Sequence, residues 1–357
     1  MEMKKIVSIS AVVALFISLT LVGAAFAQQT FNWKMGCTYP PPQFNWESKY
    51  IANDLFAKKV ADATQGRVKI KVFYSNQLVP QSQALDALKK GVVDLIAATS
   101  YWAGTIPETD FVWLPFWSKG EEHAIHALRD TKIGKILDDG YRQHGSHLLY
   151  YWPVSIEGIM SKKPIRAFDD VKGMKFRVSS AIWPSWYKDM GVAPINVAVA
   201  EQYEALMRGT LDATIYPIYT IETYKFYEVC KYLTLPGFVD PLPCYTLVSL
   251  KAWNALPPDL QQTVQKVALE IEKESIVGSQ KLTDSVLDFS AKRGVEVIRL
   301  NRTEFEKFRQ SAMPLWEKFA AKSPACGEMV KIIRANLEQW TATRPEAKKW
   351  EERWLAK

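Results

Sequence analysis

The sequence ALKKGVVD at residues 87–94 returns as ALMRGTLD at residues 205–212. Both copies place Ala-Leu before a basic residue, a glycine and, three residues later, an aspartate. Upstream of each copy, at residues 66–73 and 173–178, a glycine is followed by alternating basic and apolar residues. This pattern predicts strand, helix, glycine stop and strand in both halves of the chain. Two similar α/β halves indicate two lobes with a ligand cleft between them, because open α/β sheets bind ligands at the carboxyl ends of their strands.

The start of the chain resembles a secretory signal peptide. A short basic segment precedes an uncharged, apolar or small run over residues 6–26, and Ala25-Phe26-Ala27 fits the small-x-small cleavage rule. We therefore expect residues 1–27 to be removed and the mature protein to be exported. A retained membrane anchor is the alternative, since the apolar run is long enough to span a bilayer.

The charge distribution and the aromatic content of the chain indicate which classes of partner or ligand the protein binds. The formal net charge is +7 over 357 residues, and the basic residues are scattered rather than gathered in a block. This distribution is typical of a solvated surface, and we expect no nucleic-acid partner. The chain also contains 13 Trp, 15 Tyr and 16 Phe residues. Such side chains fill cores and also suit the walls of a small-molecule pocket.

A long helix and repeated crossings are expected between the lobes. Residues 258–292 begin with Pro-Asp and place apolar residues at the 3.6-residue spacing of one buried stripe. The strand pattern at residues 148–154 leads into the second lobe, and the pattern at residues 245–250 leads back. The expected division is lobe I from residues 28–153 and 244–282, and lobe II from residues 154–243 and 283–357. Repeated crossing fits hinge motion within a monomer better than two independent domains.

Polar and aromatic residues follow the strands of the first lobe. Thr99, Tyr101 and Trp102 come at the carboxyl end of the strand expected over residues 92–98, where a ligand would bind. Lid packing is an equally supported role for the two aromatics. Tyr39 opens a rigid Tyr-Pro-Pro-Pro turn after the first strand and is a further candidate.

No catalytic constellation is visible in the sequence. It contains no nucleophile elbow, HExxH, Walker A or GxGxxG pattern. The histidines form two i, i+3 pairs, His123 with His126 and His144 with His147, and we favour solvated helix faces over a metal site for them. We expect no enzymatic activity, no metal and no other cofactor.

The cysteines leave their redox state open. Cys37, Cys230, Cys244 and Cys326 fit no CxxC or zinc pattern. An exported protein can oxidise them, and Cys230 and Cys244 are the closest pair in sequence. Buried free thiols agree equally well with this spacing.

Arg177 is the strongest candidate for ligand binding. It lies near the end of the strand expected over residues 174–178, which approaches the cleft. A planar guanidinium offers two parallel donors that match a carboxylate. In a buried cleft it requires an anion, from a ligand or from a side chain. The alternative is an exposed strand arginine paired with Asp212 or Glu201.

Two longer motifs surround this arginine. Residues 170–178 read DVKGMKFRV, and residues 201–212 read EQYEALMRGTLD. They resemble the D-x-K-G-x-K-x-R-V and E-x-Y-x-A-L-x-x-G-x-x-D signatures of DctP-type solute receptors of TRAP transporters, and residues 64–68 and 87–94 fit the first lobe of that family. The resemblance implies a periplasmic receptor with two α/β lobes joined by strands and a long helix. Its implied partners are a small organic acid and an ion-driven membrane permease, and Arg177 takes the position of the arginine that clamps the ligand carboxylate.

Three departures from the family pattern bear on the ligand. Glu157 stands where many members carry a second arginine, Tyr216 where many carry asparagine, and Val199 where phenylalanine is frequent. A carboxylate in place of a cation argues against a strongly anionic dicarboxylate or sialic acid. We therefore expect a monocarboxylate with an apolar or aromatic body, near Trp183 and Phe238, whose ammonium or hydroxyl group pairs with Glu157. Alternatively, Glu157 points into solvent and the aromatics belong to the core.

Three other functions remain compatible with this sequence. A receptor for an ATP-driven importer has a similar fold, and a ligand sensor for a membrane kinase also acts by closure. A periplasmic enzyme on this scaffold would need a nucleophile and a base in the cleft. Neighbouring genes distinguish the two transport systems, because one needs an ATPase and the other needs large and small permease subunits.

Overall fold

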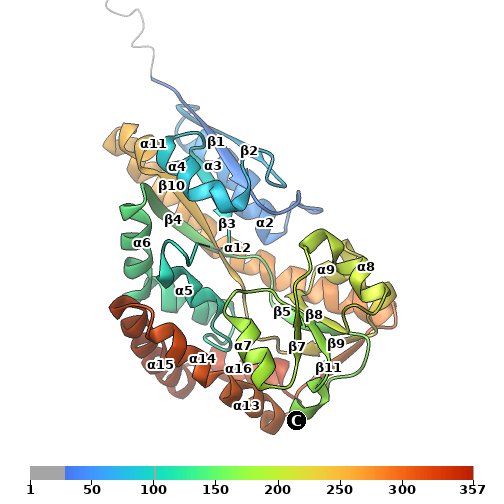
Figure 1. Cartoon of the computed structure of the whole chain (residues 1–357). Helices are drawn as coiled ribbons and strands as arrows, with labels where there is room; N and C mark the ends of the chain where they lie inside the picture. Colours follow the sequence, from blue (N-terminus) through green and yellow to red (C-terminus); the bar gives the residue numbers. More distant parts are fainter. Residues whose placement is uncertain (1–28, 100–101, 357) are drawn as a thin grey trace, which may run out of the picture.

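The strands of this chain form two separate mixed sheets, one in each lobe, in a computed structural model that describes residues 29–99 and 102–356 (Figure 1). Sheet A has the strand order β2-β1-β3-β10-β4, with β1 Phe31–Cys37, β2 Val68–Phe73, β3 Leu95–Ala98, β4 Ser146–Pro153 and β10 Pro243–Ser249. Strands β1, β2 and β3 are parallel, whereas β10 runs antiparallel to both β3 and β4. The parallel strands therefore end at the same edge of sheet A.

Sheet B belongs to the second lobe. Its strand order is β11-β9-β5-β8-β6-β7, with β5 Glu157–Ser161, β6 Lys175–Arg177, β7 Ala193–Ile195, β8 Ala213–Pro217, β9 Tyr232–Leu235 and β11 Glu296–Arg299. Strand β6 is parallel to β7 and β8, and β5 runs antiparallel to β8 and β9. The two-lobed α/β fold expected from the repeated sequence is confirmed.

Each copy of the repeated sequence forms a helix that ends at a glycine. Helix α4, Ala84–Lys90, ends at Gly91 with φ +73°, and helix α8, Gln202–Met207, is followed by Gly209 with φ +74°. A left-handed conformation is open to glycine at little cost, so both helices stop and the chain turns back into a strand.

The repeated aspartates also have equivalent roles. Asp94 accepts a hydrogen bond from the Lys34 amide at 2.7 Å, and Asp212 accepts one from the Lys175 amide at 2.9 Å. Each carboxylate thus satisfies the backbone of the neighbouring strand at the point where its own strand begins. This shared bond explains why the sequence repeats the aspartate three residues after the glycine.

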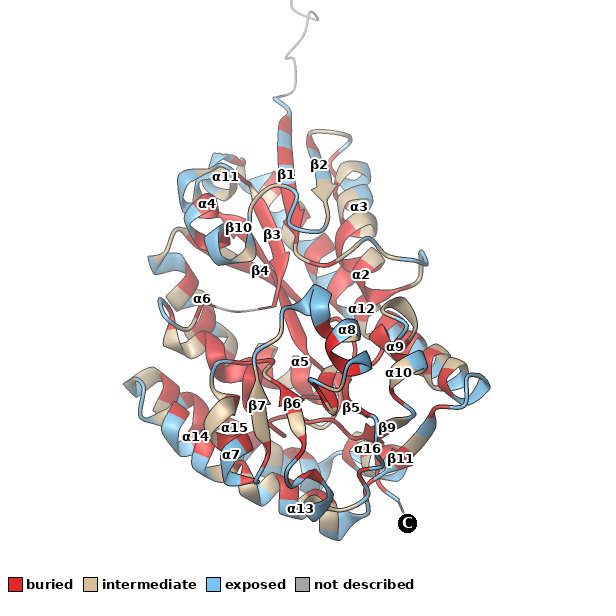
Figure 2. Ribbon diagram, turned by 45° about the vertical axis from the view of Figure 1, so that its right-hand side comes forward, coloured by how far each residue is buried: buried red, intermediate tan, exposed pale blue. Residues whose placement is uncertain are grey.

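Short helices cover the faces of both sheets, and their apolar sides are buried while their outer sides are exposed (Figure 2). Those that follow strands of sheet A are α2 Ser48–Tyr50, the π-helical turn η1 Ile51–Leu55, α3 Phe56–Ala63, η2 Gln81–Gln83, α4, η3 Pro107–Trp113, α5 Glu121–Arg129, α6 Ile133–Gln143 and α11 Leu250–Ala255. Those in the second lobe are η4 Phe168–Val171, α7 Trp183–Asp189, η5 Val199–Glu201, α8, α9 Thr220–Thr223 and α10 Phe226–Val229.

Two crossing segments and one long helix join the lobes. The segment that leaves β4 and the segment that enters β10 lie side by side. The Val154 amide donates a hydrogen bond to the Leu242 carbonyl, and the Glu157 amide donates one to the Val239 carbonyl. Helix α12, Pro258–Lys292, packs against β4 and α3 of one lobe and against α9 and β11 of the other (Figure 1). The paired crossing segments and the continuous helix α12 thus connect the two lobes, and we call this connection the hinge.

The C-terminal helices form a layer below both lobes in Figure 1. They are α13 Arg302–Ser311, α14 Met313–Ala320, α15 Pro324–Thr343 and α16 Pro345–Trp354. Helix α14 packs against α7 of the second lobe, whereas α15 packs against η3, α5 and α6 beside sheet A. None of the described helices is both long and apolar enough to cross a bilayer.

Candidate functional site

A cleft of about 650 Å³ lies between the two sheets, where the carboxyl ends of their parallel strands face one another. Residues after β1 and β3 line it from one lobe, and residues at the ends of β6 and β8 line it from the other. The lining consists of Thr38, Tyr39, Pro40, Asn76, Gln81, Ser82, Thr99, Arg177, Val178, Ser179, Ser180, Ala181, Asn196, Ala198, Val199, Tyr216, Pro217, Tyr224 and Leu242. This is the edge at which α/β sheets bind ligands.

Arg177 ends strand β6 and is held in the cleft wall by neutral groups. Its Nε donates to the Val197 carbonyl at 3.1 Å, and Nη1 donates to Ser179 Oγ at 3.1 Å. The Ser179 hydroxyl donates a hydrogen bond to the Ile215 carbonyl at 2.7 Å, so its oxygen is left to accept the hydrogen bond from Arg177. The guanidinium is therefore oriented before any ligand arrives, and Nη2 keeps its protons free for an acceptor in the cleft.

The positive charge of Arg177 is not compensated by any ion pair within the described residues. The residue is 7% exposed, and neither Asp212 nor Glu201 pairs with it. Asp212 instead binds the Lys175 amide at the opposite end of the strand. Since a buried cation without an anion is costly, this arrangement favours the binding of an anionic ligand at Arg177.

Tyr216 supports the same guanidinium from β8. The Arg177 Cζ atom lies 5.3 Å from the centre of the Tyr216 ring, within the range of a cation–π interaction. Tyr224 lies beside Tyr216, with ring centres 6.3 Å apart, and also lines the cleft. Together these two rings form an aromatic wall next to Arg177, the one charged residue in the described lining of the cleft.

Tyr39 and Thr99 bring the first lobe into the cleft. The Tyr39 hydroxyl lies 3.4 Å from the Cys244 sulfur, and its ring packs edge-on against Trp152 at 6.0 Å. Thr99 donates to the Pro243 carbonyl at 3.3 Å, and its own carbonyl accepts from Gln81 at 2.8 Å. Both residues are thus tied to the segment through which the chain returns from the second lobe.

Four other candidates lie elsewhere or outside the described residues. Tyr101 falls outside them. Trp102 donates to the Gln81 carbonyl at 3.2 Å and packs edge-on against Tyr141, so it supports a cleft residue without lining the cleft itself. Trp183 and Phe238 are 0% and 1% exposed, pack against each other at 6.1 Å, and belong to a buried aromatic cluster. Whether these rings also reach a ligand stays a prediction.

Glu157 is buried beside the cleft lining and is not part of it. It begins β5, is 1% exposed, and neither of its carboxylate oxygens has a hydrogen-bond partner in the described part of the chain. Burial raises the pKa of this carboxyl to about 8, while the nearby charge of Arg177 opposes the rise. The alternative in which Glu157 points into solvent is wrong, because the side chain is buried, and this burial favours the protonated form of the carboxyl.

Several polar residues of the lining escaped the sequence analysis. Gln81, Asn76, Asn196 and the pair Ser179-Ser180 contribute amides and hydroxyls to the cleft. The two serines come two and three residues after Arg177, so their position just beyond a strand end was a usable signal. Asn76 sits in a turn with φ +59°, and Asn196 follows β7; neither pattern distinguishes a binding residue from an ordinary loop residue.

The histidines and cysteines have structural roles. His123 is fully buried, not solvated as expected: its ring lies 2.9 Å from Asn336 Oδ1 and accepts from the Lys119 amide, and burial lowers its pKa to about 4. The described residues contain no group of three metal-binding side chains. All four cysteines are buried free thiols.

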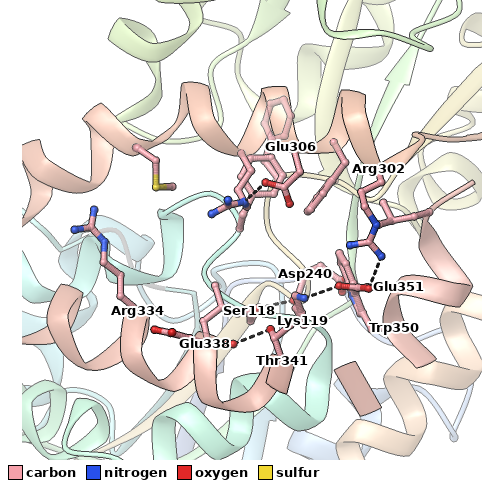
Figure 3. A pocket seen from close by; sticks show the side chains of 18 of the residues that line it. Ser118, Lys119, Asp240, Arg302, Glu306, Arg334, Glu338, Thr341, Trp350 and Glu351 are labelled. Atoms are coloured by element: carbon pink, nitrogen blue, oxygen red, sulfur yellow. Dashed lines mark hydrogen bonds and ion pairs between the residues drawn. The ribbon is translucent and has the colours of Figure 1, made fainter. Parts of the chain in front are cut away.

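A second cavity, of about 580 Å³, lies between the hinge segment and the C-terminal helices (Figure 3). Its walls include Phe116, Phe238, Phe305, Trp316 and Trp350, and four cations surround it. Every cation is ion-paired at a nitrogen–oxygen distance of 2.6 or 2.7 Å: Lys119 and Arg302 with Glu351, Arg309 with Glu306, and Arg334 with Glu317. The second cavity is therefore a poorer anion site than the cleft, although it has more cations.

Comparison with known proteins agrees with this geometry. The chain is 27% identical over 266 residues to the 2,3-diketo-L-gulonate-binding periplasmic protein of Escherichia coli, which covers 72% of this chain and 80% of that protein. A TRAP periplasmic solute-binding protein from Desulfovibrio salexigens, solved with bound orotic acid, superposes with a TM-score of 0.77 at 25% identity, over 87% of this chain and 99% of that one.

A further solved structure shows the same fold. A TRAP periplasmic solute-binding protein from Ochrobactrum anthropi gives a TM-score of 0.81 at 24% identity, over 89% of this chain and 98% of its own. The family model for bacterial extracellular solute-binding proteins, family 7, matches residues 45–323. The chain therefore belongs to the DctP family of bacterial extracellular solute-binding proteins, the receptors of TRAP transporters.

Proposed function

We propose that this protein is a periplasmic receptor that captures a small monocarboxylate with an apolar or aromatic body and delivers it to a TRAP permease. The observation that carries the proposal is the state of Arg177. It is buried at the cleft wall, oriented by neutral acceptors, and without an anionic partner in the described structure. A ligand carboxylate would complete its hydrogen bonding and balance its charge.

The charge of the cleft favours one carboxylate rather than two. Among the described residues that line it, Arg177 alone is charged. A second carboxylate would have to leave water without a cation to receive it, at a cost of several kcal/mol. Glu157, buried beside the cleft, is a carboxyl and supplies no cation that could receive a second carboxylate.

The remaining lining suits a body with flat apolar faces and a few polar edges. Tyr39, Tyr216 and Tyr224 offer aromatic surface, which contributes about 25 cal/mol per Å² of apolar area removed from water. Asn76, Asn196 and Gln81 can hydrogen-bond carbonyl or amide edges of a ring. The orotic acid bound by the Desulfovibrio relative is a ligand of this description, with one carboxylate on a planar ring.

Capture is expected to proceed by closure of the lobes around the hinge. The cleft is lined from both lobes, so bending brings Thr99 and Tyr39 toward Arg177 and excludes water from the ligand. Exclusion of water lowers the local dielectric and strengthens the ion pair between the ligand and Arg177. The closed form then presents both lobes to the permease at once.

The first test is native mass spectrometry of the exported protein, purified without refolding, followed by thermal-shift measurements. The panel would contain orotate, benzoate, phenylacetate and indole-3-acetate against succinate, malate and malonate. We expect a monocarboxylate to co-purify or to raise the melting temperature, since a ligand at 100 times its Kd stabilises by about 2.7 kcal/mol. Nanomolar binding of succinate or malate, with no monocarboxylate bound, would overturn the ligand class.

Export and the permease partner need separate tests. N-terminal sequencing of the protein from the periplasm should begin at Gln28 if the signal peptide is removed as proposed. Adjacent genes for large and small integral-membrane permease subunits would support the TRAP partner. An adjacent ATPase gene in their place would favour an ATP-driven importer.

A further inference from the structure

Glu157 occupies an unusual position for an ionisable group. Both of its carboxylate oxygens are buried and lack a donor in the described structure. Its backbone is fixed by the hinge, because its amide donates to Val239 at 3.2 Å and a Cβ on Gly237 would lie only 2.2 Å from its carbonyl oxygen. The carboxyl is thus held in a site that offers nothing to stabilise its ionised form except one neighbouring charge.

That neighbouring charge belongs to Arg177. Strand β6 contributes Arg177, whose charge acts on the Glu157 carboxyl, and helix α7 contributes Tyr187, a buried hydroxyl that is also without a partner in the described residues. Strand β8 places Pro217 opposite Glu157, and the adjoining hinge segment supplies no ionisable side chain at Gly237, Phe238 or Val239. Among the described residues, Arg177 is the one cation that acts on Glu157, and the same cation lines the cleft.

Arg177 would therefore serve two carboxyl groups once a ligand is bound. If Glu157 were ionised, one cation would face two anions in a site shielded from water, where like charges repel strongly. If Glu157 is protonated, Arg177 and the ligand carboxylate form a neutral pair. The complex with a neutral Glu157 is consequently the more stable one.

We propose that Glu157 couples ligand capture to a proton: the carboxylate ligand binds to the form of the receptor in which Glu157 is protonated, and an ionised Glu157 takes up one proton from solvent as the ligand binds. The inference rests on the proposed function of the cleft as a carboxylate site. The proton moves to a Glu157 carboxylate oxygen, and no other bond is made or broken. Glu157 acts through Arg177, as a positioning residue. When Glu157 is ionised it weakens the attraction between Arg177 and the ligand carboxylate, and when it is protonated it does not.

The sign of the pH dependence follows from linkage. The carboxyl of the free receptor has its pKa raised to about 8 by burial, and a bound ligand removes the opposing effect of Arg177, which raises the pKa further. Affinity should hence be constant below about pH 8 and fall by up to tenfold per pH unit above it, until the pKa of the complex is reached. A receptor of this kind binds its ligand best under neutral or acidic conditions.

Isothermal titration calorimetry with benzoate, phenylacetate and indole-3-acetate tests the proposal, because each has one carboxyl that titrates far below pH 6. The Kd would be measured from pH 6 to pH 9.5, in pairs of buffers with different ionisation enthalpies, which gives the number of protons taken up. We expect the wild-type Kd to rise about fivefold from pH 8 to pH 9 and more steeply above pH 9, with uptake approaching one proton. Glu157→Gln should remove both effects, and Glu204→Gln, an exposed carboxyl on α8, should keep both.

The possible failures can be told apart. If a probe binds the wild type with a pH-independent Kd and no proton uptake, the coupling is disproved while the receptor function stands. If Glu157→Gln keeps the wild-type pH profile, the proton goes to another group and the assignment to Glu157 is wrong. If no monocarboxylate binds at any pH, the proposed function fails, and this inference fails with it. The wild-type uptake measurement needs no variant, so it does not depend on the folding of Glu157→Gln.

Discussion

The cleft and the second cavity are similar in size, but they differ in whether their cations are paired with anions. The cleft, of about 650 Å³, has one charged residue in its described lining, and that residue has no ionic partner. The second cavity, of about 580 Å³, has four cations, all paired with glutamates. The feature that distinguishes the cleft as the candidate anion site is therefore one buried charge without an ion pair in the described structure, and neither cavity size nor the number of cations reveals it.

The two regions also use aromatic side chains differently. In the cleft, the Tyr216 ring contacts the guanidinium of Arg177, which forms no ion pair within the described residues. In the second cavity, Trp316 lies under Arg334 at 5.7 Å, but Arg334 already has Glu317 as its partner, and the Trp316 ring nitrogen donates to the Pro115 carbonyl. The same pairing of ring and arginine serves a candidate binding site in one place and packing in the other.

The largest expected effect on ligand binding distinguishes Arg177 in the cleft from Arg309 in the second cavity. Arg177→Ala removes a buried, charge-assisted pair with the ligand and should weaken binding at least about 30-fold, since such truncations cost about 2–5 kcal/mol. Melting of the ligand-free protein should change little, because Arg177 has no ionic partner to lose. Calorimetry and differential scanning fluorimetry measure the two quantities.

Arg309→Ala in the second cavity is the matched control. It removes a half-exposed cation paired with Glu306 and should leave the ligand Kd within about twofold, because such surface pairs contribute about 0–1 kcal/mol to stability and none of it to the cleft. Equal losses of affinity in both variants would remove the distinction between the two cavities.

A second expected effect concerns the two buried carboxyls, Glu157 beside the cleft and Asp240 beside the second cavity. Burial raises the pKa of each to about 8; for Asp240 the charge of Glu121 adds to the rise. Between the unfolded pKa, near 4, and pH 8, the folded protein holds protons that the unfolded chain has released, so stability falls as pH rises through this window. Glu157→Gln and Asp240→Asn each replace a titrating carboxyl by an amide and so remove its share of the stability lost at high pH. Each substitution should stabilise the protein by a few kcal/mol at pH 9 and by little at pH 4.

Urea unfolding at pH 4, 7 and 9 measures this effect. A stability difference that is constant with pH would show that the substitutions act through packing and not through ionisation. The comparison becomes sharper with ligand present, because Asp240→Asn should leave the pH profile of binding intact whereas Glu157→Gln should flatten it.

The smallest expected effect concerns the ring beneath Arg177. Tyr216→Leu keeps an apolar side chain but removes the π face, and it should weaken ligand binding about 3- to 10-fold, in line with about 1 kcal/mol for a partly desolvated cation–π contact. Trp316→Phe, the counterpart in the second cavity, should lower the melting temperature through its lost hydrogen bond without changing the Kd. An unchanged Kd in Tyr216→Leu would mean that the ring does not orient Arg177 for the ligand.

Much of the fold was predictable from local patterns. The glycine stops at Gly91 and Gly209, the aspartates three residues later and the helix over residues 258–292 appear in the structure as the sequence indicates. Each of these features depends on residues a few positions apart, so periodicity and backbone preference suffice to find them. The burial of His123 was missed, because it depends on Asn336, more than 200 positions away.

The sequence by itself determined the two α/β halves, the long connecting helix and the placement of Arg177 at the end of a strand, since short-range spacing and turn chemistry set all three. Only the tertiary structure decided which candidates share the cleft: it brings Tyr39, Thr99, Arg177 and Tyr216 together, and it buries Trp183 and Phe238 in an aromatic cluster. It also decided that, among the described residues, Arg177 has no anionic partner and Glu157 has no hydrogen-bond donor. Charge compensation and burial depend on groups brought together from distant parts of the chain, and no local pattern records which groups those are.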